Sequence, residues 1–225
     1  MNEAADPLRS AAETMRAVRD RCVWSQQITH RDLVPYLIEE SAELIDAVEE
    51  GPRAELREEL GDLLWQVLFH AEIASRDPDD PFDIDDVARG LTEKMVRRHP
   101  HVFAGETAET PEQVLVLWNA AKAAEKHART SVLDGVSERM PSLALAQKLV
   151  GKAAAVPQAG LAGGSREPDR RDDPPAPTTE AELGDALLQL VATARAHGWD
   201  AERALRERLR VLQADIRSAE TSPTT

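Results

Sequence analysis

Cysteines, secretion signals and membrane-length apolar runs are scarce or missing in this chain. Only Cys22 among its 225 residues carries a thiol, so no disulfide can form within one chain. Nothing resembles the core of a signal peptide or an apolar segment long enough to span a bilayer. We therefore expect a cytoplasmic protein that does not bind membranes. Because no recognisable motif ties a histidine to Cys22, we interpret this thiol as packed or incidental rather than nucleophilic.

Basic residues are also in short supply. Lysine and arginine number 27 against 41 aspartates and glutamates, which gives a formal net charge of −14. General binding to a nucleic-acid backbone needs a basic surface, so nucleic acid is not an expected partner. Part of the acidic excess would be neutralised if some of the carboxylates bound metal ions. The length suits one full helical domain plus something smaller.

No convincing alternation of apolar and polar residues indicates a strand, and almost every segment has apolar residues at helical spacing. The fold class is therefore predicted to be all-α. Thr110, Pro111 and Gln113 form a helix-start signal, in which Gln113 is placed to close a capping box. The predicted helices span 7–22, 33–50, 53–76, 84–98, 111–127, 142–154, 179–197 and 200–219.

Two carboxylate clusters interrupt the apolar patterns of the second and third predicted helices. The first is Glu39, Glu40 and Glu43, and the second is Glu59 and Asp62. Like-charged neighbours three or four residues apart cost about 0.2–0.5 kcal/mol per pair, so two such rows brought together need a compensating cation. Mg²⁺ fits best, with Mn²⁺ also possible, because it prefers hard oxygen ligands and shares its coordination shell with water and phosphates.

A turn between these helices would bring the two clusters together. Gly51-Pro52 separates the helical patterns and predicts an antiparallel hairpin with its acidic positions face to face. A solvated acidic face is the simpler interpretation of the first cluster alone, whereas both clusters together favour a metal site. The apolar stripes that we expect to be buried are Leu37, Ser41, Leu44 and Val48, then Leu56, Leu60, Leu63, Leu64, Val67 and Leu68.

Lys94, Arg97 and Arg98 form the densest cationic group in the first part of the chain. Basic residues are favoured in a last helical turn, so a purely structural role is one interpretation. The other is a cationic wall for a polyphosphate, which carries more charge than one or two Mg²⁺ ions neutralise. Tryptophans could stack on a nucleobase, although in a small helical domain they more often belong to the core. Lys122 and Lys126 are further candidates for binding phosphates. Trp24 and Trp118 are the candidates for stacking on a nucleobase.

Residues 156–178 are rich in proline and hold almost nothing that could enter a core, so they are predicted to be a flexible linker. Beyond them, Glu182-Leu-Gly-Asp185 repeats Glu59-Leu-Gly-Asp62. We therefore predict a first domain over 1–155 and a partial second copy over 179–225.

Extending the alignment of the copies places Val211, Ala214 and Asp215 where the first copy has its cationic group. No glutamate-rich helix precedes the second Glu-Leu-Gly-Asp motif. The second copy is therefore predicted to be structural, in packing or in stabilising a dimer.

A long ordered series of motifs runs from about Met15 to Ala153. Its members are Cys22-x-Trp24, Pro35-Tyr36, Glu39-Glu40-x-x-Glu43, Glu59-Leu-Gly-Asp62-Leu-Leu, Lys94-x-x-Arg97-Arg98-His99-Pro100-His101-Val102-Phe103 and Trp118-x-x-x-Lys122. This series resembles the signature of the MazG family of nucleoside triphosphate pyrophosphohydrolases. The likeness implies a MazG-like helical bundle in which the hairpins of two subunits pair, and Mg²⁺-dependent cleavage of a nucleoside triphosphate to the monophosphate and pyrophosphate.

The resemblance also implies roles for individual residues. Glu40, Glu43, Glu59 and Asp62 would bind metal, with Glu39 as a further ligand or a base for water, so that Glu39 and Glu43 are the candidate catalytic carboxylates. The residues that would hold the nucleotide are Lys94, Arg97, Arg98, Trp118 and Lys122. One departure is Cys22-Val-Trp-Ser25, where the family usually has Cys-Pro-Trp-Asp.

We accordingly expect a homodimeric hydrolase of broad nucleotide range that removes non-standard or surplus nucleoside triphosphates. One alternative is a narrow-specificity deoxynucleotide or phosphoribosyl-nucleotide pyrophosphohydrolase. The other is a non-catalytic helical module that binds nucleotide and Mg²⁺. The incomplete second copy and the altered Cys22 segment favour the non-catalytic module, and the complete carboxylate set favours an enzyme.

Overall fold

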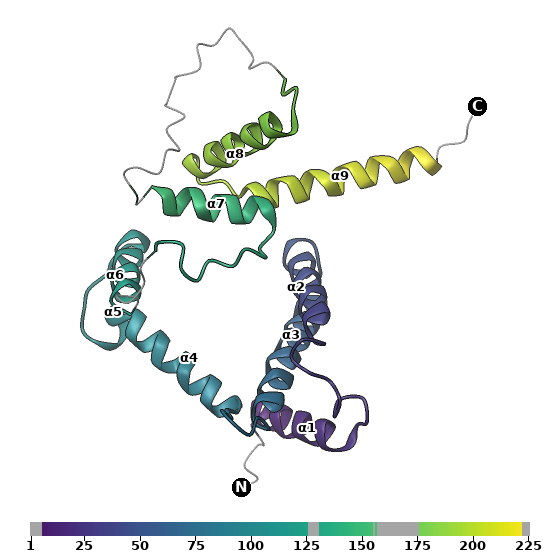
Figure 1. Cartoon of the computed structure of the whole chain (residues 1–225), viewed down its shortest axis with the longest axis vertical. Helices are drawn as coiled ribbons and strands as arrows, with labels where there is room; N and C mark the ends of the chain where they lie inside the picture. The colour runs from purple at the N-terminus through teal and green to yellow at the C-terminus, as the bar shows by residue number, and fades with distance from the viewer. Residues whose placement is uncertain (1–5, 126–130, 155, 157–175, 222–225) are drawn as a thin grey trace. The chain divides into compact units, whose positions relative to one another are not determined.

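The computed structural model describes residues 6–125, 131–154, 156 and 176–221, and every regular element within these ranges is an α-helix (Figure 1). The all-α expectation is therefore confirmed. The chain divides into two compact units, Met1–Glu125 and Lys126–Thr225. None of the described helices is both long and apolar enough to cross a lipid bilayer.

The helices of the first unit lie close to their predicted positions. They are α1 (Pro7–Arg21), α2 (Val34–Glu49), α3 (Arg53–Ala74), α4 (Ile84–Arg98), α5 (Pro100–Phe103) and α6 (Pro111–Ala124). The sequence patterns did not predict α5, because a single turn is too short to show helical periodicity.

Polar side chains start several of these helices. The Asp83 carboxylate accepts from the backbone N–H of Asp86, and Asp86 accepts from Asp83 in return, so α4 begins with a full capping box. Thr110 caps α6 as predicted, at 3.3 Å from the backbone nitrogen of Gln113. The Gln113 side chain, however, accepts from the backbone N–H of Glu109 at 2.6 Å. The reciprocal half of the capping box is thus shifted by one residue.

Helices α2 and α3 form the predicted antiparallel hairpin (Figure 1). The turn requires glycine at position 51, because a Cβ there would lie 2.7 Å from the Cα of Ala47. The core of the unit lies at the other end of α3, where Leu68 and Phe69 pack with Met15 of α1 and Leu33 of the loop before α2. The hairpin is therefore fixed at both ends, by a tight turn and by the core.

The apolar stripes of the hairpin are less buried than we predicted. Leu68 is buried, but Val48, Leu60 and Val67 are 63%, 52% and 42% exposed. Their predicted burial is wrong for a single chain, because two helices can cover only one face of each other. A stripe wider than that contact stays open unless a further layer packs on it.

The second unit contains α7 (Ser142–Ala153), α8 (Glu180–Ala196) and α9 (Ala201–Thr221). The Gln147 side chain of α7 joins it to the start of α9, donating to the carbonyl of Trp199 and accepting from the N–H of Ala201. The sequence predicts a first domain that ends at residue 155, whereas the contacts of α7 are with α8 and α9 of the second unit. The predicted linker lies mostly in 157–175, outside the described residues.

Candidate functional site

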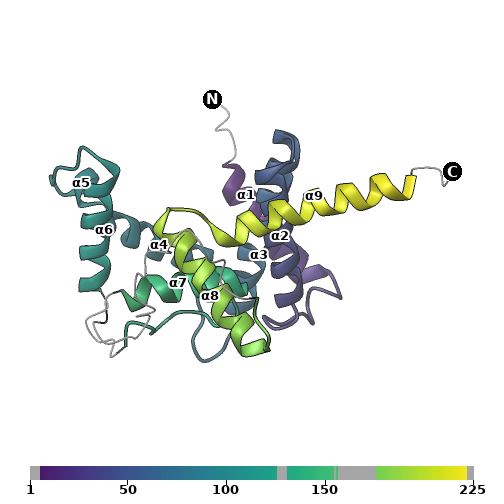
Figure 2. The same cartoon turned by 90° about the horizontal axis from the view of Figure 1, so that it is seen from above.

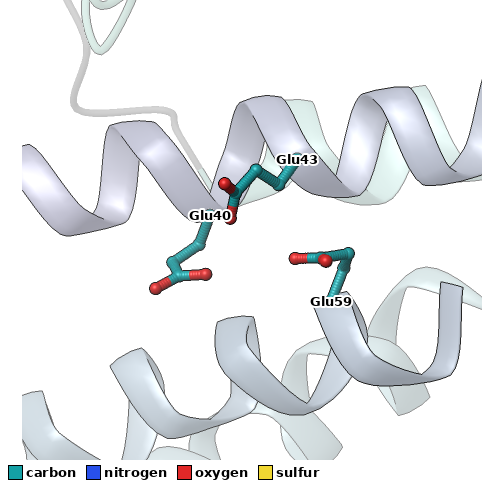
Figure 3. A group of neighbouring side chains, drawn as sticks. All are labelled: Glu40, Glu43 and Glu59. Carbon is teal, nitrogen blue, oxygen red and sulfur yellow. The ribbon is translucent and has the colours of Figure 1, made fainter. Parts of the chain in front are cut away.

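Three glutamates converge from the two arms of the hairpin. Glu40 and Glu43 project from α2 toward α3, and Glu59 projects from α3 toward them (Figure 3). Each offers one carboxylate oxygen, and these oxygens all lie within 4.8 Å of one another. It is the single such group of three or more acidic, histidine or cysteine side chains among the described residues.

Burial and mutual repulsion both act on these carboxylates. The pKa of Glu40 is raised by desolvation, then by the charges of Asp62, Glu43 and Glu39, while the nearby Gln66 amide opposes the rise. The pKa of Glu59 is raised by desolvation and then chiefly by Glu43 and Asp62. The Oε2 atom of Glu59 is also buried with no hydrogen-bond partner. Such a group is incomplete without a cation or protons.

The two other predicted ligands lie at the edge of this group. Asp62 is close enough to raise the pKa of both Glu40 and Glu59. Glu39 is exposed and raises the pKa of Glu40. The structure thus brings all five predicted carboxylates into one neighbourhood, with Glu40, Glu43 and Glu59 at its centre.

An acidic groove of about 320 Å³ continues from the cluster toward the hairpin turn. Its lining includes Glu43, Asp46, Glu50, Glu55 and Glu59. Glu55 therefore extends the acidic row of α3 by one turn, at a spacing of four residues from Glu59. This groove gives small cations a path along which the electrostatic potential is negative.

The donor set fits a hard divalent cation. Opposite ligands of Mg²⁺ lie about 4.2 Å apart, twice the usual metal–oxygen distance. The cluster spans at most 4.8 Å, so small changes in glutamate side-chain torsions suffice to close it around an ion. Carboxylates without nitrogen or sulfur donors are the ligands expected for Mg²⁺ or Mn²⁺.

Gln66 is a residue of this site that the sequence analysis missed. It is fully buried on α3, one turn beyond Asp62, and both polar atoms of its amide lack a hydrogen-bond partner. Leaving a buried amide unpaired costs about 1–3 kcal/mol, so its presence beside Glu40 requires a compensating role. Its spacing from Asp62 and Glu59 places it on the acidic face of α3, which is the signal that could have identified it.

The predicted cationic residues at the end of α4 meet α6. The Arg98 guanidinium donates to the Glu125 carboxylate at 2.6 Å and lies 5.2 Å from the centre of the Trp118 ring. Arg97 lies 3.4 Å from the same carboxylate. Hydrogen bonding from Arg98 and the charges of both arginines lower the pKa of Glu125. Arg98 is therefore held in place, with its side chain 14% exposed, whereas that of Arg97 is 54% exposed.

The remaining candidates fall into three groups. Lys94 and Lys122 are half-buried on α4 and α6, the two helices that carry Arg98 and Trp118. Trp24 contacts Tyr36 and the core residue Phe69 edge-on, which supports a packing role for it. Lys126 lies outside the described residues. Within 6–125, no hydrogen bond or ion pair joins the glutamate cluster to Lys94, Arg97 or Arg98.

The family model of the MazG nucleotide pyrophosphohydrolase domain matches residues 28–103, which contain the glutamate cluster and the cationic end of α4. Helix α6 and the second unit lie outside this match.

Three relatives illustrate the similarity. A 26.1 kDa protein of Streptomyces cacaoi is 47% identical over 95% of this chain and 82% of its own length. A nucleoside triphosphate pyrophosphohydrolase of Mycobacterium tuberculosis is 48% identical over 68% of this chain and 46% of its own, so this chain spans about half of that relative. A nucleoside triphosphate pyrophosphohydrolase/pyrophosphatase MazG of Thermotoga maritima is 36% identical over 93% of this chain and 84% of its own.

Proposed function

Because this chain belongs to the MazG family of nucleotide pyrophosphohydrolases, we propose that it hydrolyses nucleoside triphosphates to monophosphates and pyrophosphate in a Mg²⁺-dependent reaction. The observation that carries this proposal is the convergence of Glu40, Glu43 and Glu59 from two helices. A scaffold has no physical reason to hold three carboxylates so close together with two of them, Glu40 and Glu59, half-buried, because repulsion and desolvation oppose folding. A hydrolase needs this arrangement to hold a cation beside a polyphosphate.

Each carboxylate has a proposed role, and Glu43 has two. A bound Mg²⁺ would supply charge neutralisation at the phosphate oxygens and would lower the pKa of a nearby water. Glu40, Glu43, Glu59 and Asp62 hold the ion. Exposed Glu39, adjacent to this group, accepts the proton of the water, with Glu43 as the second catalytic carboxylate.

Gln66 is proposed as a positioning residue for the same site. Its buried amide can donate to the Glu40 carboxylate and so fix the direction in which Glu40 offers its oxygens. The opposing effect of Gln66 on the Glu40 pKa supports this arrangement. Groups that orient metal ligands commonly change metal affinity or activity about 10- to 100-fold when removed.

The nucleotide is proposed to lie against α4 and α6. Lys94, Arg97 and Arg98 hold the phosphates, and Trp118 with Lys122 closes the site around the nucleoside. The contacts of Arg98 with Glu125 and Trp118 support this role, because a guanidinium held in place loses little conformational freedom when a phosphate binds.

A homodimer is part of the proposal, with the hairpins of two chains packed together. The exposed apolar residues of the hairpin support it, since a second chain could cover them. Introducing a charge at both Val48 and Leu60, which are 63% and 52% exposed, should convert the dimer to a monomer in light scattering. If the unmodified protein is a monomer in light scattering, the proposed homodimer is wrong.

The substrate range is proposed to be broad, as suits a cytoplasmic enzyme that removes non-standard or surplus nucleotides. The test is Mg²⁺-dependent pyrophosphate release from a panel of common and damaged nucleoside triphosphates. Glu43→Ala should abolish release, whereas Glu58→Ala, which removes a neighbouring exposed charge, should retain most of it. Activity on one nucleotide alone would indicate the narrow-specificity alternative, and nucleotide binding without turnover would indicate a binding module.

A further inference from the structure

Helix α9 carries its apolar residues on the outside of the second unit. The apolar positions on this outer face are Leu205, Leu209, Leu212 and Ile216, and they are 48–50% exposed. The half-buried positions include three charged residues one turn apart, namely Glu202, Arg206 and Arg210. A helix that served only its own unit would cover its apolar row, whereas α9 covers a charged row that lies beside it. These four exposed apolar residues, which we call the α9 stripe, are therefore available for contact with a partner.

The shape of α9 leaves this stripe accessible over most of its length. The start of the helix is tied to α7, where Gln147 accepts from the N–H of Ala201 and Glu202 accepts from the N–H of Ala144. The C-terminal half projects beyond α7 and α8 in both views of the molecule (Figures 1 and 2). With 21 residues, the helix is about 30 Å long.

The spacing of the stripe is that of a coiled-coil seam. Its members are separated by four, three and four residues, which is the alternation of a and d positions in a heptad repeat. Such a seam packs against a second helix with the same repeat, so that each apolar side chain enters a hole between side chains of the other helix. We propose that α9 pairs in antiparallel orientation with α9 of a second copy of this chain.

The seam is complementary to itself in one antiparallel register. Leu209 then faces Leu212 of the second copy, and Leu205 faces Ile216 of the second copy. The two-fold axis repeats both contacts, which gives four apolar layers with no residue of the stripe left over. No other segment of the chain is needed to cover the stripe.

The flanking charges decide the orientation. In this register Arg208 lies opposite Asp215 of the second copy, and Arg206 lies opposite Gln213 of the second copy. The symmetry produces two arginine–aspartate pairs and no like-charge contact along the seam. A parallel pair with the same seam would instead place Arg208 beside Gln213 of the second copy and leave the Arg208–Asp215 pairing unmade.

This pairing does not depend on the proposed enzymatic activity. It gives the second unit a function of its own, as an association element separate from the hairpin surface of the first unit. It also accounts for Asp215, which together with Val211 and Ala214 replaces the cationic group of the first copy. Asp215 becomes an orientation-setting charge, and Ala214 lies on the side of α9 opposite the seam.

Disulfide trapping in the full-length chain tests the proposal. In a Cys22→Ser background, a size-tagged Leu209→Cys chain is co-expressed with an untagged Leu212→Cys chain and oxidised. The expected main product is the mixed covalent dimer, in at least about threefold excess over either same-variant product. The matched control is Ala214→Cys, which is on the same exposed helix but outside the seam and should not cross-link. The trapped product reports contact at α9 whether or not the hairpins also associate.

Each other result overturns the proposal. Predominant same-variant products would show parallel pairing, and absence of covalent dimer, or equal cross-linking through Ala214→Cys, would show that α9 does not pair through this seam. Charge reversal is a second test that leaves the apolar stripe intact. Arg208→Asp and Asp215→Arg chains should prefer each other over themselves by about threefold or more, since both flanking pairs become attractive only in the mixed dimer. Equal mixing would contradict the antiparallel register.

Discussion

The Glu-Leu-Gly-Asp motif occurs twice in this chain. The glutamates of the two copies differ in burial, in neighbouring residues and in the direction of their pKa shifts. In α3, Glu59 is half-buried opposite Glu40 and Glu43, and desolvation and repulsion raise its pKa. In α8, Glu182 is exposed and accepts hydrogen bonds from the backbone and hydroxyl of Thr178 at the start of the helix, which lower its pKa. The same residue is thus a repelled member of a cluster in one copy and a helix-capping group in the other.

The two glutamates differ because different helices pack against α3 and α8. Helix α3 packs against α2, whose glutamates complete the cluster, whereas the helices that contact α8 are α7 and α9. Helix α7 contains no acidic residue, and within the described part of the chain no carboxylate of α9 joins Asp185 in a group of three or more. A short acidic motif therefore becomes part of a carboxylate cluster only when a second acidic row packs on it.

The largest difference in activity is expected between variants in which the aspartate of one motif or of the other is replaced by alanine. We expect Asp62→Ala to lower the rate of pyrophosphate release by at least about 100-fold, because a metal ligand contributes more than the groups that orient it. Asp185→Ala should stay within about twofold of the unmodified protein. Steady-state kinetics at saturating Mg²⁺ measure both, with circular dichroism to confirm folding. Loss of activity in a folded, normally assembled Asp185→Ala protein would contradict the structural role of the second copy.

The glutamines that follow the motifs should differ by a smaller factor. Gln66→Leu is expected to raise the Mg²⁺ concentration needed for half-maximal activity about 10- to 100-fold. Its melting temperature should change little, because an apolar side chain of similar size replaces a buried amide that has no hydrogen bond of ordinary geometry and only a weak interaction with Glu40. The matched control is Gln189→Leu in α8, whose exposed side chain should change neither quantity. An unchanged Mg²⁺ requirement in Gln66→Leu would remove Gln66 from the site.

Replacing Glu59 or Glu182 by glutamine should change the melting temperature in opposite directions at pH 7. These changes are the smallest of the expected effects. In the presence of a chelator, Glu59→Gln should raise the melting temperature at pH 7, because the native state disfavours ionised Glu59. Its raised pKa means that the stability Glu59 contributes is present at low pH and lost as pH rises through that pKa, so the gain should shrink toward pH 4. Saturating Mg²⁺ should reverse the order, since only the unmodified protein gains the full stabilisation of bound ligand.

Glu182→Gln should instead lower the melting temperature at pH 7. The lowered pKa of Glu182 means that its contribution is present above the ordinary glutamate pKa of about 4.3 and is lost as pH falls through the native value. Mg²⁺ should not change this difference. Thermal unfolding followed from pH 3.5 to 7.5 measures both variants, and the same sign for the two at pH 7 would contradict the distinction between the motifs.

The hairpin and its carboxylates were predictable from sequence because they depend on local signals. Helical spacing, the Gly51-Pro52 turn and two acidic rows on adjacent helices suffice to bring Glu40, Glu43 and Glu59 together. Helix ends were predicted within a few residues for the same reason, since caps such as Thr110 act over three or four positions.

Features that depend on distant partners were not predictable in this way. The Arg98–Glu125 ion pair joins residues 27 positions apart, and nothing in the local pattern of α4 indicates it. The assignment of α7 to the second unit depends on its contacts with α8 and α9, which follow a long intervening segment. Helix α9 likewise covers a charged row beside its apolar row, and only the folded unit reveals which part of the helix is covered.

Binding of Mn²⁺, followed by the electron paramagnetic resonance signal of the free ion, tests the central claim most directly, because it needs neither substrate nor turnover. The unmodified protein should bind Mn²⁺ at the hairpin, and Glu59→Gln should weaken that binding by at least about 100-fold. Glu182→Gln, the same substitution in the other motif, should bind Mn²⁺ as the unmodified protein does. Unchanged Mn²⁺ binding in Glu59→Gln would contradict the assignment of the hairpin cluster as the metal site.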